Sequence, residues 1–282
     1  MLTGTVNKDN AVQIVDLAYW YDPDRIILNT INLTIADNEF IAILGQNGSG
    51  KTTLLKNISG LLRPCRGSIH IRGMDTSEMG VAHIAGKIGF VMQDSDRQLF
   101  EQTVYDETAF ALKHIMPRND IPRKVEESLN AVGLWDKRDA FPLALNRADR
   151  VKVVFASVLA MGPAIIMLDE PAAGQDNRGC RMIMDMITNL HAQGYTIILV
   201  THNIAIAAQY ARRIIALKDG SVYMDGSAAD IFGQEEKLSG TGIIPPQITR
   251  LSGRLRKHVP LDEDALSCGD LAAKLVQLKQ SV

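Results

Sequence analysis

Short apolar runs alternate with amphipathic segments along most of the chain. The continuous apolar run 40–44 is typical of a strand buried on both faces of a parallel sheet, and two further mainly apolar strands are expected at 165–168 and 196–200. Each precedes a segment with helical spacing: 51–58, 178–192 and 203–210. This alternation predicts an α/β fold with a mainly parallel sheet and right-handed crossovers.

Further strands and an inserted helical region complete the predicted domain. Shorter strands are expected at 69–71 and 88–92, at 11–17 and 31–35 in an N-terminal layer, and at 214–217 and 222–224 around a hairpin turn. Between about 94 and 162 the pattern becomes mainly helical, which predicts an inserted helical subdomain. One of its helices is expected at 150–161.

The pattern changes again near the C-terminal end. Regular secondary structure is expected to become sparse after about Phe232, and residues 240–246 resemble a linker. A last helix is predicted from Cys268, with Ser267 as its cap and Asp270 three residues later. We therefore divide the chain into one domain over 1–235 and a C-terminal extension over 236–282.

Composition and charge limit the functional classes. The 282 residues are 46% hydrophobic and 22% charged, with a formal net charge of −2, which is ordinary for a globular protein. Nucleic-acid binders usually carry a strongly basic face, so no nucleic-acid partner is expected. No basic segment followed by an apolar one marks a signal peptide, and the most apolar stretch, 153–168, is shorter than the roughly 20 residues of a membrane span. We expect a cytosolic chain whose membrane role, if any, comes through a partner.

A phosphate-binding loop is predicted by the run Gly45-Gln46-Asn47-Gly48-Ser49-Gly50-Lys51-Thr52, which matches G-x-x-x-x-G-K-[ST] between a strand and a helix. Glycines let backbone N–H groups converge on phosphate oxygens, and the helix N-terminus adds a positive partial charge. Lys51 is expected to reach the β- and γ-phosphates, and the Thr52 hydroxyl to bind Mg²⁺. Thr53, the next residue, is also counted as nucleotide-binding.

Two carboxylates end the apolar strand at 165–168. Asp169 is expected to hold Mg²⁺, and Glu170 to orient or deprotonate the attacking water. Without a phosphate-binding loop in the same chain, the pair would be only a solvated acidic strand end. Together the two motifs predict hydrolysis of a nucleoside triphosphate.

With these motifs in place, residues 12 to about 232 resemble the nucleotide-binding subunits of ABC transporters. The resemblance implies a RecA-like parallel core, an N-terminal antiparallel β layer and a helical subdomain, with ATP and Mg²⁺ as ligands. It also implies that Gln93 senses the γ-phosphate through Mg²⁺ and that His202, after a later strand, contacts it. Tyr21 matches the aromatic residue that stacks on adenine, and Ala173-Gly174-Gln175-Asp176 resembles the D-loop.

The signature motif of that family, Leu-Ser-Gly-Gly-Gln, is degenerate here. Aligned on Arg150-Val151, the corresponding segment is Leu143-Ala144-Leu145-Asn146-Arg147. Ala144 lacks the hydroxyl, and Leu145 and Asn146 add side chains where glycine lets the backbone approach phosphate. In this family the signature completes the partner's ATP site, so the resemblance implies an asymmetric heterodimer with a second ATPase whose signature is intact.

Two further segments resemble the ATPases of energy-coupling-factor (ECF) importers. One is Gln93-Asp94-Ser95-Asp96-Arg97-Gln98-Leu99-Phe100, followed by Thr103-Val104 and Glu107-Thr108-Ala109-Phe110; the other is the tail with Gly242-Ile243-Ile244-Pro245-Pro246. This resemblance implies a transmembrane coupling subunit, a small substrate-binding membrane subunit, and a vitamin or metal ion as cargo. The chain would then sit peripherally on the cytoplasmic face of the membrane. Its extension would be a dimerisation element, or alternatively a helix that covers its own cassette.

Three other interpretations stay open. The chain can be the ATPase of another ABC transporter type, or a switch that binds ATP without hydrolysing it. A soluble ABC ATPase of DNA repair or translation is less consistent with the sequence. Only 92 residues (143 − 51) separate Lys51 from Leu143, without the sustained heptads of a coiled-coil insertion, and only one cassette is present.

Overall fold

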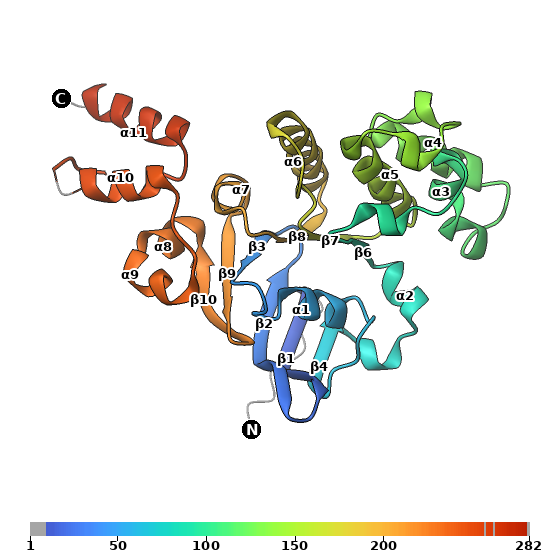
Figure 1. The fold of residues 1–282 in the computed structure, drawn as a ribbon, viewed down its shortest axis with the longest axis horizontal. Coiled ribbons are helices and arrows are strands. Elements are labelled where there is room, and N and C mark those ends of the chain that lie inside the picture. Colours follow the sequence, from blue (N-terminus) through green and yellow to red (C-terminus); the bar gives the residue numbers. More distant parts are fainter. Residues whose placement is uncertain (1–9, 257, 262, 281–282) are drawn as a thin grey trace.

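The computed structural model describes residues 10–280, with the exception of 257 and 262. Its central sheet has the strand order β10-β9-β3-β8-β7-β6 (Figure 1). The strands are β3 (Phe40–Leu44), β6 (Ile88–Val91), β7 (Ile165–Asp169), β8 (Thr196–Val200), β9 (Arg213–Lys218) and β10 (Ser221–Ser227). All neighbours pair in parallel except β10, which forms an antiparallel hairpin with β9. The predicted parallel α/β core is confirmed.

A second, antiparallel sheet covers one face of this core. Its order is β2-β1-β4-β5, from β1 (Asn10–Asp22), β2 (Arg25–Ala36), β4 (Arg66–Ile71) and β5 (Met74–Asp75). The side chains of β3 explain why the central strands are apolar throughout. Ile41 and Ile43 face the core shared with the antiparallel sheet, whereas Ala42 and Leu44 face the core beneath the helices on the other side.

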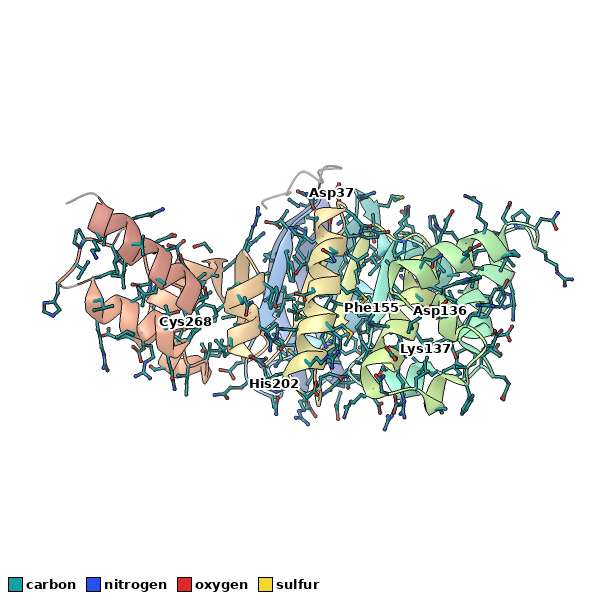
Figure 2. All side chains as sticks on the ribbon, turned by 90° about the horizontal axis from the view of Figure 1, so that it is seen from above. Asp37, Asp136, Lys137, Phe155, His202 and Cys268 are labelled. Carbon is teal, nitrogen blue, oxygen red and sulfur yellow. The ribbon has the colours of Figure 1, made fainter. Side chains whose placement is uncertain are left out.

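The helices lie around these sheets as an inserted lobe and as covers of the central sheet. The lobe contains α3 (Val104–Ala109), α4 (Ile121–Ala131) and α5 (Arg147–Ala160), and the other helices of the cassette are α1 (Lys51–Ile58), α2 (Val81–Ala85), α6 (Asn177–Ala192) and α7 (Ile204–Tyr210). The 3-10 helices are η1 (Thr76–Glu78), η2 (Ser95–Gln98), η3 (Ala111–His114), η4 (Trp135–Lys137), η5 (Pro142–Ala144) and η6 (Ser239–Thr241). The fully buried Phe155 of α5 joins the lobe to the core (Figure 2).

The start of α5 differs from the prediction. We expected a helix from Arg150, but α5 begins at Arg147 because Asn146 caps it. The Asn146 side chain accepts a hydrogen bond from the Asp149 N–H at 2.9 Å, and Asp149 in turn binds Lys137. The residue that replaces a signature glycine therefore has a structural role of its own.

The C-terminal extension is more ordered than expected. Beyond β10 the chain forms α8 (Ala228–Gly233), α9 (Glu235–Leu238), α10 (Gln247–Leu255) and α11 (Cys268–Gln280), so the expectation that order thins after Phe232 is wrong. The reason is burial: Phe232, Leu238 and Ile243 join the main core. The start of α11 at Cys268 is confirmed, since the Ser267 Oγ accepts a hydrogen bond from the Asp270 N–H.

The extension lies at the opposite end of the molecule from the helical lobe (Figure 1). A small separate core forms there, in which Leu271 of α11 is buried and Leu278 packs beside it, while Leu275 stays 38% exposed. Among the described helices, none combines the length and the apolar character that crossing a membrane requires.

Candidate functional site

Three strand ends meet at one edge of the central sheet. Ile43 of β3 pairs with Val200 of β8, and Asp169 of β7 pairs with the same Val200. Parallel strands end at a common edge, so the loops that follow β3, β7 and β8 start side by side. Each of these loops carries one of the predicted chemical groups.

The loop after β3 leads into α1. The last loop residue, Gly50, has a φ of +99°, and a Cβ there would lie 2.7 Å from Leu28 Cδ2 and 3.0 Å from the Ile27 carbonyl oxygen. Only glycine fits this turn without strain. Lys51 then folds back over the loop, and its Nζ donates to the carbonyl oxygens of Gly45 and Gln46, each at 2.8 Å. Lys51 is thus held by neutral groups rather than by an ion pair.

Burial shifts the charge balance of the site. It lowers the pKa of Lys51, against the opposing effect of the Glu170 and Asp169 carboxylates. Burial also raises the pKa of Asp169, although a hydrogen bond from Thr52 lowers it. The Thr52 Oγ1 donates to Asp169 Oδ2 at 2.8 Å. The Lys51 ammonium group and the Asp169 carboxylate are therefore both partly removed from water, and they form no ion pair with each other. This arrangement favours the binding of charged ligands.

Glu170 is held in place by the loop after β8. Its Oε1 accepts hydrogen bonds from the His202 N–H at 2.7 Å and the His202 Nδ1 at 2.6 Å, and its Oε2 accepts one from the Thr201 hydroxyl at 3.1 Å. The carboxylate accepts only, so Nδ1 carries the proton. Glu170 also has a φ of +53°, a left-handed conformation that is uncommon and strained for a side-chain residue. These contacts maintain the strained geometry and fix the orientation of the carboxylate.

The groups surround a cavity of about 480 Å³, and His202 is among its lining residues. Most of the predicted site residues line it: Tyr21, Asn47, Gly48, Gly50, Lys51, Thr52, Thr53, Gln93, Asp169, Glu170 and His202. Gly45 and Ser49 do not. Gly45 contributes its carbonyl to Lys51, and Ser49 is buried beneath the loop.

Sequence reasoning missed two lining residues, Arg25 and Ile27. They follow Tyr21 across the β1–β2 hairpin, and this proximity to a predicted adenine-binding residue was the available signal. Tyr21 itself is 62% exposed and contacts Tyr19 edge to face, with 5.0 Å between ring centroids. An exposed aromatic ring is therefore among the groups that line the cavity.

Gln98 was also missed. It braces the segment that carries the exposed Gln93: its Oε1 accepts from the Met92 N–H at 2.8 Å, and its Nε2 donates to the Phe90 carbonyl at 3.2 Å. Gln98 lay within the segment that resembled ECF ATPases, but no spacing rule identified its partners.

The signature segment lies apart from this cavity. Leu143 and Ala144 form part of η5, and Leu145 and Asn146 adopt extended conformations with negative φ. The side chain of Arg147 packs against Gly174, the D-loop glycine, where a Cβ would fall 2.7 Å from the guanidinium carbon. No glycine backbone is available in this segment to approach a phosphate.

The donor set fits a magnesium–nucleotide complex. Mg²⁺ prefers oxygen ligands and binds through one or two carboxylates together with substrate phosphates. The Thr52 hydroxyl and the Asp169 carboxylate supply such oxygens next to the loop backbone and Lys51. Gln93 lines the same cavity with an exposed side chain.

Comparison with known proteins agrees with this geometry. A family model described as ABC transporter matches residues 28–173. A putative ABC transporter ATP-binding protein of Caldanaerobacter subterraneus is 39% identical over 92% of this chain, and the chain spans 46% of that relative, which is less than half of its length. An energy-coupling factor transporter ATP-binding protein, EcfA2, of Acetivibrio thermocellus is 34% identical over 95% of this chain and 98% of the relative.

Solved structures show the same fold. The cbiO1 protein of Clostridium perfringens, described as part of the ABC transporter complex cbiONQ, superposes with a TM-score of 0.75 at 32% identity, covering 88% of this chain and 99% of that one. The ATP-binding cassette MJ0796, bound to ADP and Pi, superposes with a TM-score of 0.68 at 28% identity, covering 77% of this chain and 98% of that one.

The raised pKa of Asp169 predicts that Asp169→Asn stabilises the folded chain at neutral pH. Burial penalises the ionised carboxylate only in the folded state, so the penalty is present while the unfolded carboxyl is charged. The gain should fade as pH falls through the raised pKa of folded Asp169 and be absent below 3.8, the ordinary pKa of aspartate, because the carboxyl is then protonated in both states. Urea unfolding midpoints measured at several pH values test this. Asp136→Asn, at an exposed position of the helical lobe, is the control. An Asp169→Asn protein no more stable than this control at pH 7 would contradict the analysis.

Proposed function

Since this chain belongs to the family of ABC transporter ATP-binding proteins, we propose that it hydrolyses ATP to power a membrane importer of the ECF type. The observation that carries the proposal is the cavity in which Lys51, Asp169 and Glu170 meet at one sheet edge. Two relatives named as energy-coupling factor transporter ATP-binding proteins, from Acetivibrio thermocellus and Caldanaerobacter subterraneus, support the importer type.

The hydrolytic roles follow from the chemistry of each group. Lys51 and the loop N–H groups bind the phosphates, and Thr52, Asp169 and Gln93 would hold Mg²⁺, which neutralises charge on the phosphate oxygens when bound. Glu170 orients the attacking water and takes its proton, because its carboxylate is fixed by Thr201 and His202. His202 faces the γ-phosphate through its other ring nitrogen. Tyr21 stacks on adenine.

Glu170→Gln is expected to lower ATP turnover by about 10² or more, because the amide keeps the shape of the side chain but cannot accept the proton. ATP should then remain bound in the assembled complex. Phosphate release and retained nucleotide are the measurements, with Glu126→Gln on the exposed face of α4 as the matched control. Turnover that stays unchanged would favour a switch that binds ATP without hydrolysing it.

We further propose that the chain works in an asymmetric pair with a second ABC ATPase. The support is the signature segment, in which Leu145 and Asn146 replace glycines and Asn146 instead caps α5. A partner with an intact signature would complete this chain's site, while the site completed by this chain would be weak. The extension, with Leu275 and Val276 exposed on α11, is a candidate contact between the two ATPases.

Restoring the signature tests the asymmetry. The substitutions Ala144→Ser, Leu145→Gly, Asn146→Gly and Arg147→Gln together should raise turnover by the chain alone, as a homodimer, by about 10². The same protein with Glu170→Gln added is the control, and it should stay inactive. Efficient turnover by the unmodified chain alone would show that no second ATPase is needed.

The membrane partner would dock on an apolar groove of about 250 Å³ between the core and the helical lobe. Its rim carries exposed apolar side chains, among them Leu61, Val81, Phe100 and Phe110. Phe100 and Phe110 contact each other edge to face at 4.7 Å. We propose that the coupling subunit covers this groove, with a small substrate-binding membrane subunit beside it, and that the chain is thereby held peripherally at the cytoplasmic face. A vitamin or metal ion is the proposed cargo.

Phe110→Asp should therefore release the chain from membranes. A buried carboxylate without a partner is unfavourable, so the apolar contact would be lost. Co-purification of membrane proteins with the tagged chain measures the effect, and Tyr223→Asp, an exposed aromatic of β10 outside the groove, is the control. Equal recovery of membrane partners with both variants would place the docking surface elsewhere.

A further inference from the structure

The loop that carries Gln93 is closed on itself by a side chain. Gln98 binds the backbone at the end of β6: its Oε1 accepts a hydrogen bond from the Met92 N–H at 2.8 Å, and its Nε2 donates to the Phe90 carbonyl oxygen at 3.2 Å. Residues 92–98 therefore form one closed loop that includes η2. A displacement of Gln93 in the nucleotide cavity is passed on to η2 through this loop.

A single arginine connects the closed loop to the signature segment. The Arg150 Nη1 donates to Oδ2 of Asp96, a residue of η2, at 2.7 Å, and its Nε donates to the Leu145 carbonyl oxygen at 2.8 Å. The Arg150 side chain is 27% exposed and that of Asp96 is 46% exposed. One planar guanidinium thus joins the loop at the nucleotide cavity to the backbone of the signature segment.

The Leu145 carbonyl belongs to a hydrogen-bonded turn that opens α5. The Leu145 N–H donates to the Pro142 carbonyl oxygen at 3.1 Å. The next residue, Asn146, caps the helix, and its backbone carbonyl accepts a hydrogen bond from the Arg150 N–H at 3.0 Å. Arg150 is therefore bound to this turn by both its backbone and its side chain, so its guanidinium and the turn move together.

We propose that Arg150 is a positioning residue that makes the signature segment report the nucleotide state of this chain's own cavity. ATP that engages Gln93 fixes the closed loop, and the link from Asp96 through Arg150 then fixes the signature segment. Contiguous hydrogen-bonded contacts of this kind can carry coupling between sites. The segment lacks the glycine backbone that approaches phosphate but keeps its link to the cavity, so its task is to signal to the partner ATPase. The inference rests on the proposed binding of ATP and deepens it by naming a path out of the site.

Amide hydrogen exchange of the full chain tests this path. The probe is Mg²⁺–ATP, and every protein carries Glu170→Gln so that ATP is not consumed. Two peptides are followed: the signature peptide, 142–150, and the loop peptide, 46–54, both of which contain hydrogen-bonded N–H groups. ATP should slow exchange in the signature peptide by about twofold to fivefold, the range that a partly exposed ion pair can transmit. In Asp96→Ala this slowing should be lost, whereas the loop peptide should still slow because ATP still binds there.

Asp94→Ala is the matched control. Asp94 lies in the same closed loop and pairs with Arg97 at 2.9 Å, so its loss breaks an ion pair of that loop without removing the link to α5. This variant should keep the slowing of the signature peptide. Gln93→Ala should lose it while the loop peptide still slows, because the nucleotide then no longer engages the closed loop. Arg150→Lys should lose it as well, since one ammonium group does not reproduce a planar guanidinium that binds two acceptors at once.

The outcomes distinguish this inference from the proposed function. If neither peptide slows in the chain with Glu170→Gln alone, the assigned ATP site is wrong. If the loop peptide slows and the signature peptide does not, the positioning role is overturned. Equal slowing of the signature peptide in Asp96→Ala and Asp94→Ala also overturns it. A contact that only stabilised the fold would change exchange to the same extent with and without ATP, and the ATP-dependent difference would then persist in Asp96→Ala.

Discussion

The common register of β3, β8 and β7 is the constraint on which the rest of the site depends. Val200 pairs with Ile43 on one side and with Asp169 on the other. Neighbouring strands lie about 4.8 Å apart, so the loops with Lys51, Glu170 and His202 leave the sheet within two strand spacings. A slip of one residue would turn Asp169 away from Thr52, because successive side chains point to opposite faces. Two apolar cores, one on each face of the sheet, hold this register.

This packing allows the site to keep groups that are unfavourable in isolation. Lys51 is bonded to two carbonyl oxygens, Asp169 to one hydroxyl, and Glu170 has a left-handed backbone conformation. Each of these features costs folding free energy. The apolar packing on both faces of the sheet offsets this cost.

Most of the fold was predictable because its signals are local. The bounds of β3, β8 and α1 agree with the predicted 40–44, 196–200 and 51–58, since a strand buried on both faces must be apolar throughout and a phosphate-binding loop must open a helix. It was likewise predictable that Lys51, Asp169 and His202 lie close together, because the motifs that contain them follow strands in the same order along the chain as in the family that the sequence resembles. The contacts of Gln98 were not, because no helical or strand periodicity links it to the backbone groups of Met92 and Phe90, which lie six and eight residues before it. For the same reason residues 240–246 were predicted to be a linker, although Thr241 and Ile243 are buried.

The exposed apolar surface of the groove between the core and the helical lobe affects how the folded chain behaves in the cell. Phe100, Phe110, Leu61 and Val81 present apolar surface to water as long as no partner covers them. Contiguous exposed apolar surface promotes self-association. A copy that lacks the proposed partner is then prone to self-association. Under the proposed function, synthesis of the chain in balance with its partner is what keeps this surface covered.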